Sequence, residues 1–424
     1  MLQMPLANLI NQSLEAIDCD TDYSGKLLVI LGAGVWQLSG IRAAKQLNFT
    51  VLAVDADSEA PGLALVDYPL CADPCDIPNI IKYLKTLNQQ PIGVVAFITE
   101  ALQLAAAKLR ELLKLPGPNS DLISRMTDKA LQRQCWQTHG ISNPAWHVFN
   151  QAKDAVSFLG QRRLDRYIIK PANSSGSRGI TVIDAETSTE KIQEGVGLAF
   201  QFSSNGKILI EQFIKGVEYA VETFSHNGHV YILAISEKCK VAGTDDTVAS
   251  ELATPAISSK AQQEIGSLVQ RALLALNYQN GPAHTEILRT KEGNLYLVET
   301  GARGGGFLVA DGIVPAASHF NLPITTILST VGATFSFSPP RIQQCFVLRF
   351  IPSRPGVVKA IIGFETISQI EGVSACPLVK IGDTCFSPRT DGGRLAYIFS
   401  IGKTREEALK KANEATDSIN FEVN

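Results

Sequence analysis

The stretch that decides the fold spans residues 284–303 and reads HTEILRTKEGNLYLVETGAR. Apolar and polar residues alternate on both sides of Gly293, which predicts a β-hairpin. A two-residue loop would place Glu286 directly opposite Glu299, whereas a three-residue bulged loop would shift the register by one and leave two unrelated surface glutamates. Like charges that face each other destabilise a hairpin, so the first register predicts a cation between them. Oxygen ligands alone suit Mg²⁺ or Mn²⁺ held jointly with substrate phosphates.

A fixed positive charge and a glycine-rich segment follow this hairpin at once. Arg303 is followed by three glycines, Gly304 to Gly306. The backbone of such a segment is flexible and rich in accessible N–H groups. An arginine next to a metal site can hold the oxygens of a phosphoryl group during its transfer. The segment therefore extends the predicted site beyond the two carboxylates.

Two segments nearer the N-terminus have a chemistry that suits a nucleotide. Residues 167–179 form a strand that ends in Lys170 and continues into a loop of serines and glycines, whose backbone N–H groups can approach phosphate oxygens closely. Taken alone, this loop is equally well an exposed hairpin tip. Residues 208–218, ILIEQFIKGVE, offer an apolar slot for a base and a carboxylate, Glu218, for ribose hydroxyls. The alternative for this second segment is an edge strand with a solvated acidic face.

The first βαβ unit resembles a dinucleotide-binding turn but departs from it at one position. The apolar run at residues 27–31 leads into Gly32-Ala-Gly34, and Asp55 ends the next strand. Gln37 stands where the third glycine of that motif belongs. A structural Rossmann-like turn is therefore favoured, and an oxidoreductase that uses a nicotinamide cofactor remains the alternative.

The composition is that of an ordinary globular protein. The chain has 424 residues, 45% of them hydrophobic, and a net charge of −3. It has no excess positive charge for a nucleic-acid backbone or an anionic membrane, so neither partner is expected. No apolar run approaches the roughly 20 residues of a membrane span, and no signal peptide is recognised at the N-terminus. A cytoplasmic location is expected, and the eight scattered cysteines are expected to be reduced.

Taken in order, these segments resemble the ATP-grasp superfamily. The resemblance rests on Lys129, on Lys170 with its loop, on 211–218 and on the hairpin that leads to Arg303. The motifs EYAVE at 218–222 and GPAHTE at 281–286 are most similar to L-amino-acid ligases and other carboxylate-amine ligases. The fold that this implies is α/β and α+β. Its expected parts are a Rossmann-like pre-domain at 1–120, a two-lobed ATP-grasp domain at 121–335 with its lid at about 145–215, and a C-terminal domain at 336–424.

The resemblance assigns roles to individual residues. Glu286 and Glu299 are the implied ligands of two Mg²⁺ or Mn²⁺ ions, and Arg303 is the implied catalytic group at the γ-phosphate. His284 shares a face with Glu286, so it is a second catalytic candidate or a purely supporting side chain. The implied ATP-binding residues are Lys129, Lys170, Ser174, Ser175, Gly176, Ser177, Gly179, Glu211, Gln212, Phe213, Ile214 and Glu218. The expected substrate-binding residues are Glu222, Glu251, Arg303, Gly304 and Gly305, and Lys238 and Lys240 are either solvated or in contact with a substrate carboxylate.

The implied reaction joins a carboxylate to an amine at the expense of ATP, through an acyl phosphate, with release of ADP and phosphate. The expected partners are these two small molecules, and a homodimer is left open. A biotin-carboxylase-like enzyme and a non-catalytic ATP-binding protein remain alternatives. Gly301 stands where family members usually carry Asn. Either the second ion loses a side-chain ligand there, or Gly301 is required for a positive φ that aims Arg303.

A short helix is expected before the lid. Thr127 is expected as its N-cap, with Asp128 complementing the helix dipole, and Gly140 as its end. In the C-terminal region, Thr404 and Glu407 form the sequence pattern of a capping box and predict the start of another helix.

Overall fold

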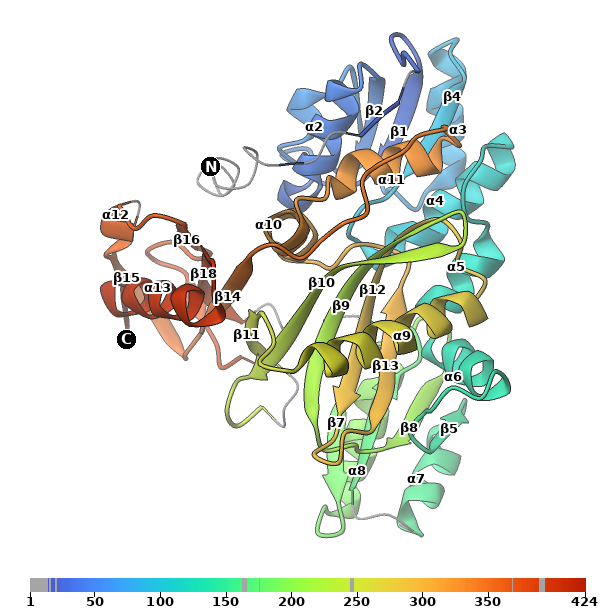
Figure 1. The fold of residues 1–424 in the computed structure, drawn as a ribbon. Coiled ribbons are helices and arrows are strands. Elements are labelled where there is room, and N and C mark those ends of the chain that lie inside the picture. Colours follow the sequence, from blue (N-terminus) through green and yellow to red (C-terminus); the bar gives the residue numbers. More distant parts are fainter. Residues whose placement is uncertain are drawn as a thin grey trace.

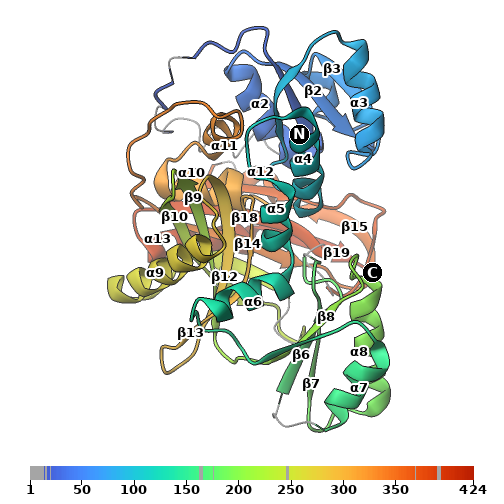
Figure 2. The same cartoon turned by 90° about the vertical axis from the view of Figure 1, so that its right-hand side faces the viewer.

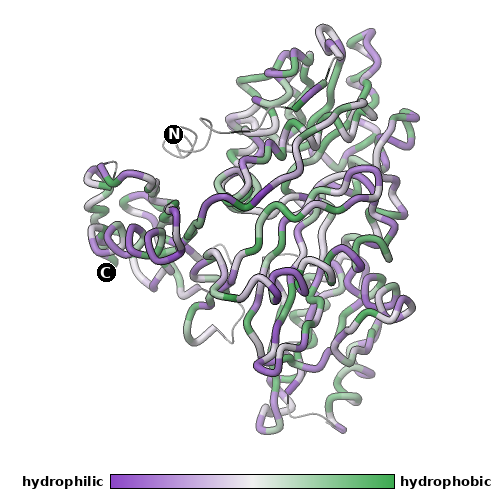
Figure 3. Tube along the Cα trace, in the orientation of Figure 1, coloured by the Kyte–Doolittle hydropathy of each residue, from purple (hydrophilic) through white to green (hydrophobic). Residues whose placement is uncertain are grey.

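The computed structural model describes residues 14, 17–19, 21–161, 166–174, 176–244, 248–367, 369–388 and 393–424. These residues form four sheets with helices packed against them (Figure 1). An N-terminal α/β unit lies at one end, a small lid at the other, and a C-terminal unit projects to one side. Figure 3 shows hydrophobic segments along the strands, whereas the last helix is largely hydrophilic.

The N-terminal unit is a parallel sheet of the Rossmann type, with strand order β3-β2-β1-β4. Strand β1 is fully buried, as expected for a strand that is covered on both faces. The turn after it is structural, because Ala33 N donates to Asp55 Oδ2 at 2.6 Å and Asp57 N donates to Asp55 Oδ1 at 3.0 Å. The elements are β1 (Leu27–Leu31), α2 (Leu38–Gln46), β2 (Thr50–Asp55), β3 (Tyr68–Cys71), α3 (Ile77–Thr86), β4 (Pro91–Val95) and α4 (Glu100–Leu113), with 3₁₀ turns at Val35–Gln37 and Leu63–Leu65.

Two short helices lead from this unit to the lid, α5 (Ser120–Thr127) and α6 (Lys129–Thr138). The expectation that Thr127 caps α6 is wrong. Thr127 still belongs to α5, where its hydroxyl donates to Ile123 O. Asp128 is the N-cap of α6, and its Oδ1 accepts from the N–H groups of Ala130 and Leu131.

The lid is a four-stranded sheet with order β5-β8-β6-β7. Helices α7 and α8 pack against one of its faces and enclose a separate core (Figure 2). The other face is therefore free to cover a ligand. The elements are β5 (Trp146–Phe149), α7 (Ala152–Gly160), β6 (Arg166–Pro171), β7 (Thr181–Asp184), α8 (Thr189–Gln201) and β8 (Ile208–Gln212).

An eight-stranded sheet runs through the remainder of the molecule, with order β13-β12-β9-β10-β11-β14-β18-β16. Strand β11 pairs with β14, so one sheet continues from the expected ATP-grasp domain into the C-terminal region. Its strands are β9 (Val217–His226), β10 (His229–Lys240), β11 (Ala249–Ala253), β12 (Gly281–Arg289), β13 (Leu295–Gly301), β14 (Cys345–Pro352), β16 (Val373–Pro377) and β18 (Arg394–Gly402).

Helices cover this sheet and complete the C-terminal unit. Helix α9 (Ser259–Ala275) contributes to the core beneath β9 and β12. Thr404 caps α13, since its hydroxyl accepts from Glu407 N at 3.2 Å, as the sequence predicts. The other elements are the π-helix η3 (Val309–Ile313), α10 (Val314–Ser318), α11 (Leu322–Thr330), α12 (Phe364–Ile367), α13 (Arg405–Ser418) and a small sheet of β15 (Gly356–Ile362), β17 (Thr384–Cys385) and β19 (Asn420–Val423). Among the described residues, no helix combines the length and apolar character that crossing a bilayer requires.

Candidate active site

A cavity of about 550 Å³ lies between the lid sheet and the eight-stranded sheet. This volume is within the range of small-molecule sites. Residues from the lid, from α6 and from strands β9, β10, β12 and β13 line it. The predicted site residues that line it are Lys129, Lys170, Ser174, Gly176, Ser177, Glu211, Gln212, Phe213, Ile214, Glu218, Glu286 and Glu299.

The two other residues that the sequence predicts at the nucleotide are Gly179 and Ser175. Gly179 does not line the cavity. It has φ +73°, and a Cβ there would lie 2.8 Å from Pro171 Cγ, so glycine is required for the loop to pack. Ser175 lies outside the described residues.

A buried ionic cluster lies at one end of the cavity. Lys170 Nζ lies 2.6 Å from Glu211 Oε2, and Arg133 Nε lies 2.6 Å from Glu211 Oε1. Burial opposes ionisation of Glu211, but Arg133 and Lys170 outweigh it and lower the pKa of this carboxyl to about 2. Burial lowers the pKa of Lys170 despite its contact with Glu211. Both oxygens of Glu211 are therefore engaged by cations, and the next residues, 212–214, line the cavity beside this cluster.

Strands β12 and β13 bring the two predicted metal ligands together. Glu286 and Glu299 are directly paired across the ladder, as the sequence predicts. The loop nevertheless has three residues, because Thr290 N donates to Asn294 O and Gly293, with φ +90°, completes the turn. Pairs near the turn are shifted by one, and an extra residue, Val298, restores the register before Glu299. The expected pairing is correct, but a β-bulge produces it and not a two-residue loop.

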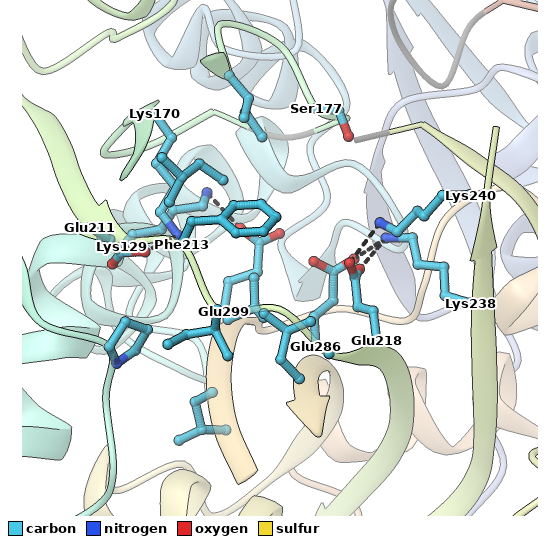
Figure 4. A pocket seen from close by; sticks show the side chains of 18 of the residues that line it. Lys129, Lys170, Ser177, Glu211, Phe213, Glu218, Lys238, Lys240, Glu286 and Glu299 are labelled. Atoms are coloured by element: carbon cyan, nitrogen blue, oxygen red, sulfur yellow. Dashed lines mark hydrogen bonds and ion pairs between the residues drawn. The ribbon is translucent and has the colours of Figure 1, made fainter. Parts of the chain in front are cut away.

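Lysines neutralise both carboxylates in this structure. Lys129 Nζ lies 2.6 Å from Glu299 Oε2, and Lys238 Nζ lies 2.8 Å from Glu286 Oε1. Lys238 also bridges to Glu218 at 2.6 Å, so it is not a solvated surface lysine (Figure 4). Burial would raise the pKa of Glu286, but Lys238 and His284 hold it well below its usual value.

The carboxylate of Glu218 contacts two lysine ammonium groups. Its Oε2 lies 2.6 Å from Lys240 Nζ, and its Oε1 is the atom that contacts Lys238. Figure 4 shows the two lysines of β10 turned toward Glu218 from the side of the cavity opposite Lys170. The predicted ribose ligand is thus at the cavity, fixed in place by both lysines.

A second charged cluster adjoins the carboxylate pair. His284 lies two residues before Glu286 on β12, with Nε2 3.7 Å from Glu286 Oε1, and its Nδ1 is hydrogen-bonded to Glu222 Oε1. The other oxygen of Glu222 accepts from Gly305 N at 2.9 Å. Burial alone would lower the pKa of His284, but Glu222 and Glu286 raise it to about 9. The imidazole is therefore positively charged at neutral pH.

The N-terminal unit also reaches this cluster. Arg303 Nη2 lies 3.2 Å from Glu100 Oε2 at the start of α4, and its Nη1 donates to Gly304 O. Among the described residues, Arg303 Nε is buried and has no hydrogen-bond acceptor. Burial works against its charge, but Glu100 and Glu299 outweigh it and raise the pKa of Arg303. The arginine is a permanent cation whose Nε–H is available to a ligand.

The structure separates one predicted substrate-binding residue from the others. Glu251 pairs with Arg349 at 2.7 Å and lies opposite Cys239 in the ladder of β10 and β11. Since side chains alternate along a strand, Cys239 and Glu251 face away from the side that carries Lys238 and Lys240. Arg349 in turn binds Asn413 and Thr416 of α13. Glu251 therefore joins the C-terminal helix to the sheet, and the expectation of a substrate contact is corrected.

The backbone explanation for Gly301 is also wrong. Gly301 ends β13, is paired with His284 and has no positive φ. A Cβ at this position would lie 3.6 Å from Arg303 Cγ, an ordinary van der Waals distance. A side chain therefore fits at residue 301.

Comparisons with known proteins agree with this architecture. Residues 166–311 match the ATP-grasp domain family, and residues 349–424 match the L-amino acid ligase C-terminal domain 2. Residues 166–311 thus match an ATP-grasp domain. The crystal structure of the L-amino acid ligase from Bacillus licheniformis superposes with a TM-score of 0.80 at 22% identity, over 95% of this chain and 99% of that one.

Curated relatives are similarly distant in sequence. The L-arginine-specific L-amino acid ligase of Bacillus subtilis is 24% identical over 74% of this chain and 76% of its own length. Biotin carboxylase 1 of Bacillus subtilis is 21% identical over 94% of this chain and 92% of its own. The expected fold is confirmed, and so is the expected class, an ATP-dependent ligase that forms carbon–nitrogen bonds.

Sequence reasoning missed three residues of this candidate site. Glu100 comes from the N-terminal unit, and nothing in its local sequence marks a partner 203 residues away. Gln132 and Arg133 follow Lys129 by three and four residues, which puts all three on one helix face. This helical spacing is visible in the sequence, but it points to the site only once the position of α6 against β13 is known.

Proposed function

We propose that the enzyme joins the carboxylate of an amino acid to an amine through an acyl phosphate, with release of ADP and phosphate. One observation carries this proposal: the facing carboxylates Glu286 and Glu299 adjoin a separate charged cluster of His284, Glu222 and Arg303. The cavity proposed to bind phosphate therefore adjoins a cluster that can bind a charged substrate. The L-amino acid ligase match at 349–424 supports an amino acid as that substrate.

The cavity suits ATP. Lys129 and Lys170 would contact the phosphates, and the loop at 174–179 would cover them. Phe213 lines the cavity beside apolar residues of both sheets and gives a base a flat surface, while Arg166 stacks on its ring with the guanidinium carbon 4.1 Å from the ring centroid. Lys238 and Lys240 would hold Glu218 where it can accept from ribose hydroxyls.

The facing carboxylates fit Mg²⁺ or Mn²⁺. Their donors are all oxygens, and the part of the chain that the structure describes contains no group of three or more His, Cys, Asp or Glu that could hold an ion without other ligands. Such a pair suits an ion that is shared with phosphates. Glu286 and Glu299 would be its protein ligands, and the ion would neutralise negative charge on the triphosphate.

The residues of the second cluster would place the substrates. In the first step a carboxylate oxygen of the substrate bonds to the γ-phosphorus, and the bond to the bridging oxygen breaks to release ADP. Arg303, with its free Nε, would neutralise the transferred phosphoryl group. In the second step the amine nitrogen bonds to the acyl carbon, phosphate leaves with its electron pair, and the amine proton passes to water.

His284 would contribute charge and orientation. Because its pKa is raised to about 9, it holds a proton at neutral pH and is a hydrogen-bond donor, not a general base. Gly304 and Gly305 would present backbone N–H groups beside it, and the contact from Gly305 N to Glu222 already fixes this segment. The lid would exclude water, because an acyl phosphate hydrolyses readily. Dependence on ATP supports a cytoplasmic enzyme, and a homodimer stays a prediction.

The test is a panel of amino-acid pairs with ATP and Mg²⁺, with phosphate release measured and amide products identified by mass spectrometry. The expected nucleotide product is ADP. AMP and pyrophosphate as main products would rule out the acyl phosphate. A parallel panel with bicarbonate and biotin tests the biotin-carboxylase type, which the relative at 94% coverage favours as second candidate. Phosphate release with bicarbonate and biotin alone would replace the ligase proposal.

A further inference from the structure

Helix α6 directs three polar side chains of one helix face at strand β13. Lys129, Gln132 and Arg133 occupy positions i, i+3 and i+4, so they share one face of the helix. Lys129 reaches the Glu299 carboxylate at 2.6 Å. The side chains of Gln132 and Arg133 reach the backbone on both sides of that glutamate.

Strand β13 is the edge of the eight-stranded sheet, so one side of its backbone has no neighbouring strand. At Thr300 the side chain of Gln132 takes the place of a neighbouring strand. Its Oε1 accepts from Thr300 N at 3.1 Å, and its Nε2 donates to Thr300 O at 2.7 Å. Arg133 Nη2 donates to Val298 O at 2.7 Å. Both side chains are 1% exposed, so these bonds form away from water.

The contacts from Gln132 and Arg133 bear on the direction of the Glu299 side chain, because they lie where the strand register shifts. Val298 is the extra residue that restores the pairing after the three-residue turn. Without the bulge, Val298 would face Glu286, and Glu299 would point to the opposite side of the sheet, because side chains alternate. The bulge alone therefore brings the second carboxylate to the cavity.

We propose that Gln132 and Arg133 are positioning residues that fix the Val298 bulge and thereby aim the Glu299 carboxylate at the metal. This inference rests on the proposed function in one respect, the assignment of Glu299 as a metal ligand. Arg133 has a second task, because the same guanidinium binds Glu211, the partner of Lys170. One helix face thus couples the phosphate-binding lysine to the metal-binding carboxylate.

The experiment measures binding of a non-hydrolysable ATP analogue, AMP-PNP, by calorimetry, once with Mg²⁺ and once with EDTA. The ratio of the two affinities isolates the metal contribution and needs no knowledge of the ligated substrates. Gln132→Leu removes three hydrogen bonds without removing a charge, and Arg133→Lys keeps the charge but not the reach to both partners. We expect each to reduce the ratio by about tenfold or more, the usual cost of losing a residue that orients a metal ligand.

A matched control separates positioning from general loss of packing. Thr285→Val removes a buried hydrogen bond to the Thr300 hydroxyl, 2.8 Å long, and leaves both backbone contacts intact. We expect it to leave the metal-dependent ratio unchanged. Glu211→Gln tests the other contact of Arg133, the one with Glu211. We expect weaker AMP-PNP binding both with and without Mg²⁺, and an unchanged ratio of the two affinities. Hydrogen exchange of residues 295–301 should rise in Gln132→Leu and not in Thr285→Val.

The possible results separate the two claims. If Glu299→Gln keeps the wild-type ratio, or wild type shows no gain from Mg²⁺, the metal assignment fails and the positioning inference fails with it. If Glu299→Gln abolishes the gain while folded Gln132→Leu retains it, the positioning inference alone is overturned. Should Arg133→Lys not fold, Gln132→Leu decides. Should Gln132→Leu also not fold, Gln132→Asn, which keeps the amide but cannot span both groups of Thr300, takes its place.

Discussion

Glu299 faces Glu286 across the β12–β13 ladder, yet the two carboxylates are neutralised by lysines from different parts of the chain. Lys129 of α6 binds Glu299, and Lys238 of β10 binds Glu286. Two like charges in direct opposition would otherwise destabilise the hairpin. The same ammonium groups line the cavity, so in the proposed function they would turn from a carboxylate to a phosphate when a nucleotide binds.

Glu299→Gln should abolish turnover and leave weak nucleotide binding. The substitution keeps the shape of the side chain but removes the charge that the metal needs, whereas the base-binding part of the cavity is unaffected. We expect the kcat to fall to less than about a tenth of wild type, a cost above roughly 1.4 kcal/mol. Steady-state kinetics and AMP-PNP calorimetry measure the two effects. A variant that keeps more than this fraction of kcat would contradict the metal assignment.

Lys238→Met should lower the Mg²⁺ concentration that gives half-maximal binding of AMP-PNP. Lys238 contacts Glu286 and therefore competes with a metal for this carboxylate. We expect a decrease of about threefold or more. Lys240→Met is the matched control, because Lys240 contacts Glu218 and its loss leaves the Lys238 contact with Glu286 in place. Equal shifts in both variants would show that the net charge of the cavity matters and the specific contact does not.

The fold was predictable from the sequence because its elements have local signatures. The buried run at Leu27–Leu31, the alternation in β9 and β12 and the cap at Thr404 each identify an element without reference to the rest of the chain. The helix boundary at Thr127 was not predictable, since Thr127 and Asp128 are both good N-caps and tertiary packing chooses between them.

The site was predictable where one strand carries several of its residues. Alternation alone relates His284 to Glu286, and the hairpin relates Glu286 to Glu299. The bulge at Val298 was not predictable, because its stabilising contact comes from Arg133, 165 residues earlier. Glu251 was misassigned for a similar reason, since its partner Arg349 lies 98 residues later, and both side chains face away from the side of the sheet that carries Lys238 and Lys240.

The stability that His284 contributes should disappear as the pH rises. The pKa of its imidazole is raised to about 9 in the folded protein, above roughly 6.5 in an unfolded chain. Below pH 6.5 both states hold the proton, and the contact with Glu222 contributes fully. As the pH increases toward 9, the folded state must retain a proton that the unfolded state has released, so this contribution declines and is lost above the folded pKa.

Chemical denaturation of wild type and His284→Gln at several pH values measures this effect. The difference in unfolding free energy should be largest near pH 6 and close to zero above pH 9. His229→Gln, on an exposed side chain, is the matched control and should show no such trend. A difference between wild type and His284→Gln that stays constant across this range would mean that folding does not raise the pKa of the imidazole.

Gly301→Asn should lower the Mg²⁺ concentration needed for half-maximal rate while kcat is preserved. Mg²⁺ requires a nearly octahedral shell of oxygens, and an amide oxygen supplied by the protein replaces a water that the ion must otherwise order. Gly301 ends β13 beside Glu299, so its side chain position adjoins the metal ligands. Strain does not oppose the substitution, because the residue has no positive φ and a Cβ has space at 3.6 Å from Arg303.

The opposing effect of Gly301→Asn is a change at Arg303. The new side chain would touch the guanidinium, whose Cζ lies 3.8 Å from the Cβ position, and could displace the group that holds the phosphoryl oxygens. Gly301→Ala separates the two effects, since it adds the Cβ without an oxygen ligand. We expect Gly301→Ala to leave the Mg²⁺ midpoint and kcat near wild type, and Gly301→Asn alone to lower the midpoint. A reduced kcat with an unchanged midpoint in Gly301→Asn would mean that glycine is kept there to leave room for Arg303, and that the second ion needs no ligand from this position.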